Sequence, residues 1–201
     1  DSRMRAMVSL QHVSGRVASP LLRNALSDAS EDLRLLAYGM LDTLEQRISR
    51  AVDLELKALR AAQAEEGPEH PGPLTLKAVH NLSDLYWEFI YQDLAQGDLR
   101  EYASRESLRY GEQALALQPD SALLCLRRGL LLHELGQFEE ASQAYDKAHA
   151  LGLPATRVLP YQAELCFERR DFTRTRELMQ QLDQWSALPR LRPIIDYWNA
   201  R

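Results

Sequence analysis

The chain contains little of what a metal or redox site requires. Its 201 residues include two cysteines, Cys125 and Cys166, which form no Cys-x-x-Cys pair and stand at no metal-binding spacing. None of its five histidines shares a helical face with an acidic or sulfur partner at the spacing of metal ligands. The sequence therefore predicts no metal site and no cofactor. Two thiols on apolar helical faces favour a reducing compartment.

The motifs of the common enzyme classes are also missing. The chain has no G-x-G-x-x-G or G-x-x-x-x-G-K-[ST] loop for nucleotides, no G-x-S-x-G nucleophile elbow and no H-E-x-x-H zinc motif. Acidic pairs do occur, for example Glu164 with Glu168. On amphipathic helices such pairs are more often solvated, or line a groove, than catalytic. We therefore expect a protein that is not an enzyme.

Long apolar runs and an excess of positive charge are missing as well. No apolar run approaches the roughly 20 residues that cross a bilayer, so the chain as given is not expected to span a membrane. The formal net charge is -5, whereas nucleic-acid binding needs concentrated positive charge. We therefore expect protein partners and no nucleic acid. With 45% hydrophobic residues, the chain can bury one core or a short stack of repeats.

Residues 1–29 begin with a basic segment. Between Ser2 and Ser27 the formally charged residues are four arginines. Gly15 and Pro20 interrupt a loose helical spacing, so we expect an arm or short helices. Two interpretations remain open. The segment is a mobile terminus, or it lies just cytoplasmic of a removed membrane anchor, where Lys and Arg accumulate and acidic residues are scarce.

Residues 30–73 combine a long helical pattern with a loop. After a possible capping box at Asp28–Glu31, apolar residues recur at steps of three and four for more than about thirty residues. A second capping box, from Asp42 to Glu45, predicts a break that leaves helices of about ten and about twenty residues. Three prolines and two glycines between Glu66 and Pro73 exclude helix and make this segment a candidate for disorder.

Residues 122–155, which have Gly129, Gly136, Ala141, Tyr145 and Ala148 at fixed intervals, resemble one unit of the tetratricopeptide repeat (TPR) family, which consists of two antiparallel helices. With Ala122 at position 1 of the 34-residue frame, the positions that define the repeat carry suitable residues. Small residues let the two helices approach closely, a tyrosine fills the space between them, and a glycine makes the turn.

Two less regular units flank this repeat. Residues 74–121 fit the frame if their first helix ends near Gly97 as the turn glycine, which leaves about five extra residues within 98–107. Residues 156–189 keep the period but have Arg170 where the turn glycine is expected. Their first helix should begin near Pro160, because proline is tolerated in the first turn of a helix and disfavoured in its interior.

These units together predict an all-α protein. The expected fold is a right-handed α-solenoid of about three TPR-like helical hairpins over residues 74–200. N-terminal helices are expected to pack against it, and residues 190–200 to form a C-terminal capping helix over the last exposed apolar surface.

The TPR frame also indicates which residues face a concave groove. A groove that combines leucine, aromatic and charged residues suits an amphipathic helix or an extended peptide, so we expect a protein-binding site. Two other interpretations remain open. The aromatic residues of 86–91 are ordinary core between helices, or the groove is filled by the chain's own N-terminal helices. The predicted groove residues are Trp87, Tyr91, Leu123, Leu126, Leu130, His133, Glu134, Arg157, Glu164, Phe167 and Glu168.

A closer resemblance covers residues 31–198. The stretches DLRLLAYGMLD, YWEFIYQDLAQGDLREYA, ALALQPDSALL and LGLPATRVLPYQAELCFERRDF resemble the PelE family. Its members are TPR-bearing inner-membrane components of the bacterial Pel exopolysaccharide apparatus. The resemblance implies two transmembrane helices that are missing from this sequence and a TPR domain at the cytoplasmic face of the inner membrane. It further implies partners within a synthase complex: a glycosyltransferase, a cyclic-di-GMP receptor and a membrane exporter.

The sequence leads to two hypotheses. In the first, the chain is a non-catalytic scaffold that holds protein segments in the groove of its repeats. In the second, it is a structural module whose groove is occupied by its own helices and whose repeats serve self-association or spacing.

Overall fold

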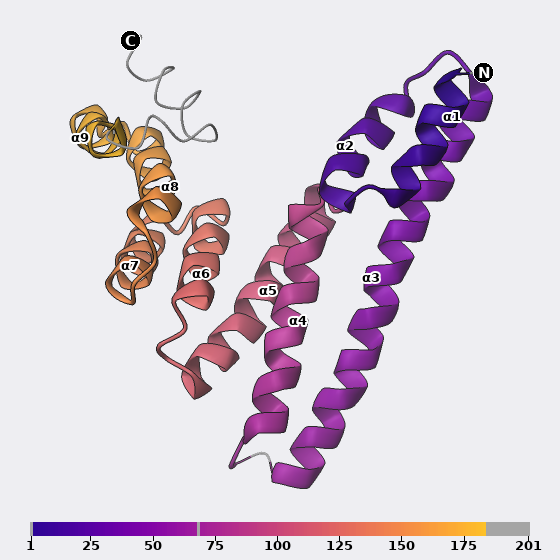
Figure 1. The fold of residues 1–201 in the computed structure, drawn as a ribbon. Helices are drawn as coiled ribbons and strands as arrows, with labels where there is room; N and C mark the ends of the chain where they lie inside the picture. Colours follow the sequence, from indigo (N-terminus) through magenta and orange to yellow (C-terminus); the bar gives the residue numbers. More distant parts are fainter. Residues whose placement is uncertain (1, 68, 184–201) are drawn as a thin grey trace. The chain divides into compact units, whose positions relative to one another are not determined.

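The computed structural model describes residues 2–67 and 69–183, and the regular elements within them are all helices (Figure 1). This confirms the prediction of an all-α protein. The chain forms two compact units with a boundary between Leu117 and Gln118. The boundary falls inside the segment 74–200 that was predicted to be one solenoid. The predicted capping helix at 190–200 lies outside the described residues.

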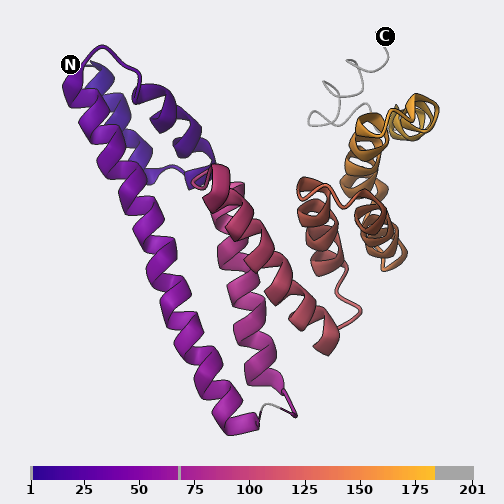
Figure 2. The ribbon, with the colours of Figure 1, turned by 180° about the vertical axis from the view of Figure 1, so that it is seen from behind.

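The first unit is built around one long helix, α3, which packs against α1, α2 and α4 (Figures 1 and 2). Helix α4 in turn packs against α5. Two serines fasten this second pair, because the hydroxyl of Ser83 donates to the carbonyl of Ser107 and the hydroxyl of Ser107 to that of Ser83, both at 2.9 Å. The elements are α1 (Ser2–Ser9), η1 (Leu10–His12), α2 (Gly15–Ala25), α3 (Glu31–Glu66), α4 (Pro73–Tyr91) and α5 (Gly97–Leu117).

Helix α3 runs without interruption for 36 residues, so the predicted break near Asp42 is wrong. The polar side chains that suggested a new helix start bond within the helix instead. The Asp42 carboxylate accepts from Gln46 Nε2 at 2.7 Å, and the Thr43 hydroxyl donates to the Gly39 carbonyl at 2.7 Å. Buried apolar residues continue on both sides of this point, among them Met40 and Ile48. Their packing favours one continuous helix.

The predicted interruption between Glu66 and Pro73 is confirmed, since α3 ends at Glu66 and α4 begins at Pro73. The Glu66 carboxylate joins the two helices. It accepts hydrogen bonds from the backbone N–H groups of Gly72 at 2.8 Å, Leu74 at 2.7 Å and Thr75 at 3.0 Å. A side chain at the end of one helix thus satisfies free N–H donors at the start of the next.

The first hairpin differs from its prediction at the turn. Helix α4 ends at Tyr91 rather than near Gly97, and Gly97 is the first residue of α5. The extra residues expected within 98–107 are therefore helical, and they lengthen α5 to 21 residues. The turn forms around Asp93, which has a φ of 52°.

The second unit consists of two helical hairpins, α6 with α7 and α8 with α9 (Figure 1). Helix α8 also packs against both α7 and α6. A Cβ added to Gly129 would lie 2.5 Å from the Tyr145 ring, so α6 and α7 do approach at the predicted glycine. The helices are α6 (Ala122–Glu134), α7 (Phe138–Ala150), α8 (Ala155–Glu168) and α9 (Phe172–Asp183).

The same turn closes the hairpins α4–α5, α6–α7 and α8–α9. A residue with positive φ donates its N–H to the carbonyl three residues earlier, and the next residue donates to the carbonyl five residues before itself. This pair of bonds defines the Schellman motif, which favours glycine. The residue with positive φ is Asp93 in the first hairpin, Gly136 in the second and Arg170 in the third.

Helix α8 begins at Ala155, so the predicted start near Pro160 is wrong. Pro160 is its sixth residue and lacks the N–H that would bond to the Thr156 carbonyl. The helix forms nevertheless, because Val158 and Leu159 are buried and would leave the core if the first turn unwound. Pro20 is likewise the sixth residue of its helix, α2.

Candidate functional site

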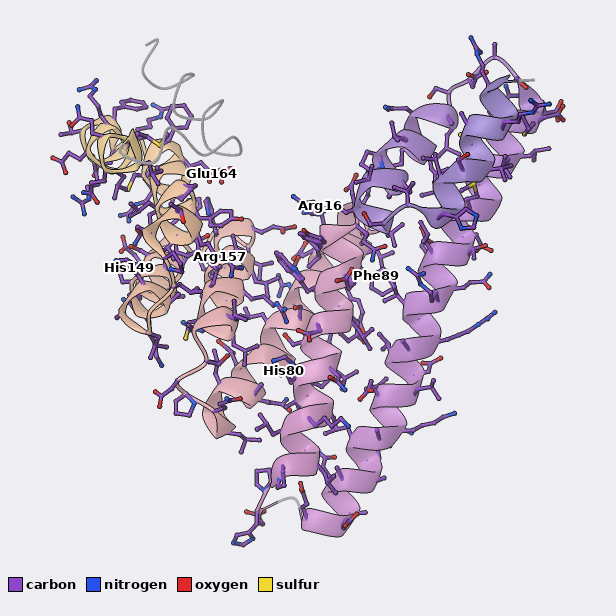
Figure 3. All side chains as sticks on the ribbon, viewed as in Figure 1. Arg16, His80, Phe89, His149, Arg157 and Glu164 are labelled. Carbon is purple, nitrogen blue, oxygen red and sulfur yellow. The ribbon has the colours of Figure 1, made fainter. Side chains whose placement is uncertain are left out.

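Within the second unit, α6 and α8 carry most of the predicted groove residues. Apolar and charged side chains follow each helix at steps of three, four and seven, which places them on one face of that helix. Figure 3 labels Arg157 and Glu164 on α8. Leu123 is 56% exposed and Phe167 38%, and Leu130 is half-buried. The four charged residues Glu134, Arg157, Glu164 and Glu168 are all exposed.

Leu126 differs from the other predicted groove residues. It is 6% exposed, so its side chain belongs to buried structure rather than to an open surface. The TPR frame places residues by helical spacing alone, and a residue beside the exposed stripe can turn inward when its helix rotates slightly.

His133 is a connecting residue rather than an open contact. Its side chain is 10% exposed. Nδ1 lies 3.2 Å from the Tyr145 hydroxyl and Nε2 lies 3.0 Å from Glu168 Oε2. The ring therefore links α6 to both α7 and α8. Phe138 packs on it edge to face, with 5.8 Å between ring centroids.

The groups on either side of the His133 ring fix the direction of these bonds. Burial, helped by the nearby Glu164, Tyr161 and Glu168, raises the pKa of Tyr145 above its ordinary value of 10.0. The Tyr145 hydroxyl therefore keeps its proton, as an ordinary tyrosine also does at neutral pH. The Glu168 carboxylate can only accept, so Nε2 of the neutral His133 ring donates to it and Nδ1 accepts from the Tyr145 hydroxyl. This arrangement holds the side chains of α6, α7 and α8 in fixed orientations.

Charge at the predicted groove positions of α6 and α8 is mainly negative, whereas Arg127 and Arg128, the two other charged residues of these helices, are half-buried and lie outside this set. Glu134, Glu164 and Glu168 contribute three carboxylates, and Arg157 one cation near the start of α8. Leu123 adds exposed apolar area. We call Leu123, Leu130, Glu134, Arg157, Glu164 and Glu168 the α6/α8 surface. Its composition is complementary to a segment that carries apolar and basic side chains.

Trp87 and Tyr91, the two remaining predicted groove residues, belong to the first unit. Their rings lie on one side of α4 with centroids 6.3 Å apart. The Arg16 guanidinium of α2 lies 4.3 Å from the centre of the Tyr91 ring and donates a hydrogen bond to its hydroxyl. At Tyr91, therefore, an arginine of the chain's own α2 contacts the predicted binding position, and the tyrosine remains 42% exposed.

Further contacts fix α2 on the turn that follows α4. The Asp93 carbonyl accepts from Arg23 Nε at 2.8 Å and from the Ser19 hydroxyl at 3.4 Å. The Asp93 carboxylate lies 3.6 Å from both Arg23 and Arg100. Sequence reasoning missed this junction. The available signal was the run of arginines without acidic neighbours in the first 27 residues, which leaves them to find partners elsewhere in the chain.

No protein-family model, curated protein or solved structure matches the chain. Among the described residues, no group of His, Cys, Asp and Glu side chains is arranged to hold a metal ion. None of the described helices is both long and apolar enough to cross a bilayer.

Proposed function

We propose that the chain is a non-catalytic scaffold of the TPR type whose second unit binds a protein segment along the α6/α8 surface. One observation carries the proposal. In each of two successive hairpins, the two helices are joined by the same type of turn. The first helices of these hairpins, α6 and α8, pack against each other, and each carries exposed apolar or charged residues along one face.

The composition of the α6/α8 surface suggests what kind of segment binds. Leu123 and Leu130 offer apolar anchors on α6, and Glu134 and Glu164 place negative charge around them, while the Glu168 carboxylate already bonds to His133. An amphipathic helix or extended peptide with basic residues beside its apolar face would bury the leucines and pair with the acids. The link through His133 holds α6 and α8 together, so the surface is preorganised for such a ligand.

The resemblance to the PelE family suggests which complex this scaffold serves. We propose that it assembles a membrane-associated exopolysaccharide synthase at the cytoplasmic face of the bacterial inner membrane. The expected partners are the glycosyltransferase, the cyclic-di-GMP receptor and the membrane exporter of that complex. Pairwise co-purification of the chain with each of these three tests the assignment. Failure to retain any of them would count against it.

Leu123→Glu is the sharpest test of the α6/α8 surface. Because Leu123 is exposed, the variant should fold normally, and a fourth carboxylate in place of an apolar anchor should weaken partner capture by about tenfold or more. Leu54→Glu on α3 makes the same change at an exposed leucine of the first unit and serves as the control. Circular dichroism checks the fold. Equal capture by both variants and the wild-type chain would refute the proposed surface.

A second candidate function is a structural module that binds to itself. The contact of Arg16 with Tyr91 favours it, since one predicted groove position is already contacted by α2. Light scattering distinguishes the two candidates. A stable oligomer that ignores all three expected partners supports the structural module, whereas a monomer that binds a partner supports the scaffold.

A further inference from the structure

The turn between α8 and α9 exposes an aromatic pair. Phe167, near the end of α8, and Phe172, the first residue of α9, lie with ring centroids 5.7 Å apart and ring planes at 62°. Phe172 is 52% exposed. Edge-to-face pairs of this kind stabilise cores and interfaces. At the surface of a hairpin, the two rings hold each other in place and form a preorganised apolar anchor.

Two arginines stand beside these rings. Arg170 lies in the turn that connects the two phenylalanines, and Arg176 follows Phe172 by one helical turn on the same face of α9. Both arginines are exposed. We call Phe167, Arg170, Phe172 and Arg176 the α8–α9 tip.

The acidic residues near the tip already have partners within the chain. Asp171 accepts from the Arg174 backbone N–H at 3.0 Å, and Glu177 accepts from the Arg174 guanidinium at 2.8 Å. Glu168 bonds to His133. Residues 167–177 carry four arginines and three acidic residues, a small positive excess within a chain whose formal net charge is -5.

The backbone at Arg170 is also unusual. Its φ of 63° lies in the left-handed region, where the corresponding residue of the preceding hairpin is Gly136 with a φ of 76°. A side chain in that region has a steric cost that glycine does not have. An arginine kept at a position where glycine would be more stable suggests that its side chain is used.

We propose that the α8–α9 tip is a docking surface for a segment of another protein in which an apolar side chain is flanked by carboxylates. The phenylalanine rings take the apolar side chain, and the guanidinium groups bind the carboxylates through paired N–H donors. This surface differs in sign from the α6/α8 surface, which is acidic. The chain's own residues 184–201 carry three arginines and one aspartate, so their charge does not complement the tip.

Fluorescence anisotropy with a defined probe tests this proposal on the full chain. The probe is a labelled synthetic peptide with a central Leu-Trp pair between aspartates, and its counterpart has lysines in place of the aspartates. We expect the acidic peptide to bind, more weakly as salt is added, and the lysine peptide not to bind. Arg170→Gly and Phe172→Ala should each weaken binding by about tenfold.

Arg170→Gly separates binding from folding, because glycine suits the observed φ and the variant should melt no lower than the wild-type chain. Arg60→Gln, at an exposed arginine of α3, removes the same charge elsewhere and should bind the acidic peptide normally. Four results would each overturn the proposal. The first two are that the acidic peptide fails to bind and that the lysine peptide binds. The other two are that Arg170→Gly binds the acidic peptide as tightly as the wild-type chain and that Arg60→Gln loses as much binding as Arg170→Gly.

Two other occupants of the tip are also tested. A labelled peptide of residues 184–201 that binds more tightly than the acidic probe would assign the tip to the chain's own C-terminal segment. Self-association in light scattering that Phe172→Ala abolishes would assign it to a second copy. Either result would overturn the proposed partner.

Discussion

At the scale of single residues, three different residue types adopt the same left-handed backbone conformation. Gly136, Asp93 and Arg170 all have positive φ at the same point of the same turn. Glycine adopts this conformation without a steric penalty, and aspartate tolerates it better than most residues. At Asp93 the side chain also pairs with Arg23 and Arg100. Sequence reasoning that looks only for glycine finds the turn at Gly136 and misplaces the turn at Asp93.

Glu66 gives a residue-scale prediction for acid stability. Loss of solvation by itself raises the pKa of this carboxyl, but hydrogen bonds from Thr75, Leu74 and Gly72 outweigh it and lower the pKa from its ordinary 4.5 to about 2. A lowered pKa means that the charged form stabilises the folded chain above pH 4.5 and that this contribution is lost as the pH falls toward 2.

The comparison of Glu66→Gln with the wild-type chain measures this contribution. We expect the variant to melt at a lower temperature at neutral pH, and the difference to shrink toward zero as the pH is lowered to about 2. Glu65→Gln removes the same formal charge from the preceding, exposed residue and is the control. A difference between Glu66→Gln and wild type that stays constant over this pH range would contradict the prediction.

At the scale of helices, the sequence predicts elements well where several signals coincide. The α6–α7 hairpin was predicted because small residues, one tyrosine and a turn glycine occur at the expected intervals. The break near Asp42 was wrong, because a capping box is a local signal and the buried stripe of α3 continues through it. The start of α8 was wrong for a similar reason, since burial of Val158 and Leu159 outweighs the lost hydrogen bond at Pro160.

Long-range docking was the part that the sequence could not supply. The contact of Arg16 with Tyr91 joins residues 75 positions apart, and no periodicity connects them. A helix with arginines and apolar residues on several faces has many possible partners. Only the tertiary structure shows that α2 docks on the turn after α4.

Two glycines allow a paired prediction about helices and turns. An added Cβ would meet no atom within 4 Å at either Gly39 or Gly136. Gly39 lies inside α3, where alanine should stabilise the chain by about 1 kcal/mol. Gly136 has a φ of 76°, where alanine should destabilise it by about 1 kcal/mol. Thermal or urea unfolding measures both changes. A change of the same sign in the two variants would show that backbone conformation does not decide the effect.

At the scale of the whole molecule, each of the two compact units has its own close helix contact. In the second unit the contact is Gly129 against the fully buried Tyr145, and in the first it is the stacked pair Tyr86 and Tyr110, with ring centroids 6.0 Å apart. If the units are stabilised separately, damage to one contact should remain within its unit. Hydrogen exchange resolved by mass spectrometry measures this segment by segment.

Gly129→Ala and Tyr86→Ala form a reciprocal test. In Gly129→Ala the new methyl group would lie 2.5 Å from the Tyr145 ring, so the packing of the ring, which also bonds to His133, must shift. Such overpacking costs about 1–3 kcal/mol, and exchange should quicken in α6–α9 while α3–α5 keep their protection. Tyr86→Ala leaves a cavity and should produce the opposite pattern. Faster exchange across both units in either variant would mean that the chain unfolds as one cooperative body. In that case, a variant that destabilises the chain and loses partner binding would not show which of the two units binds the partner.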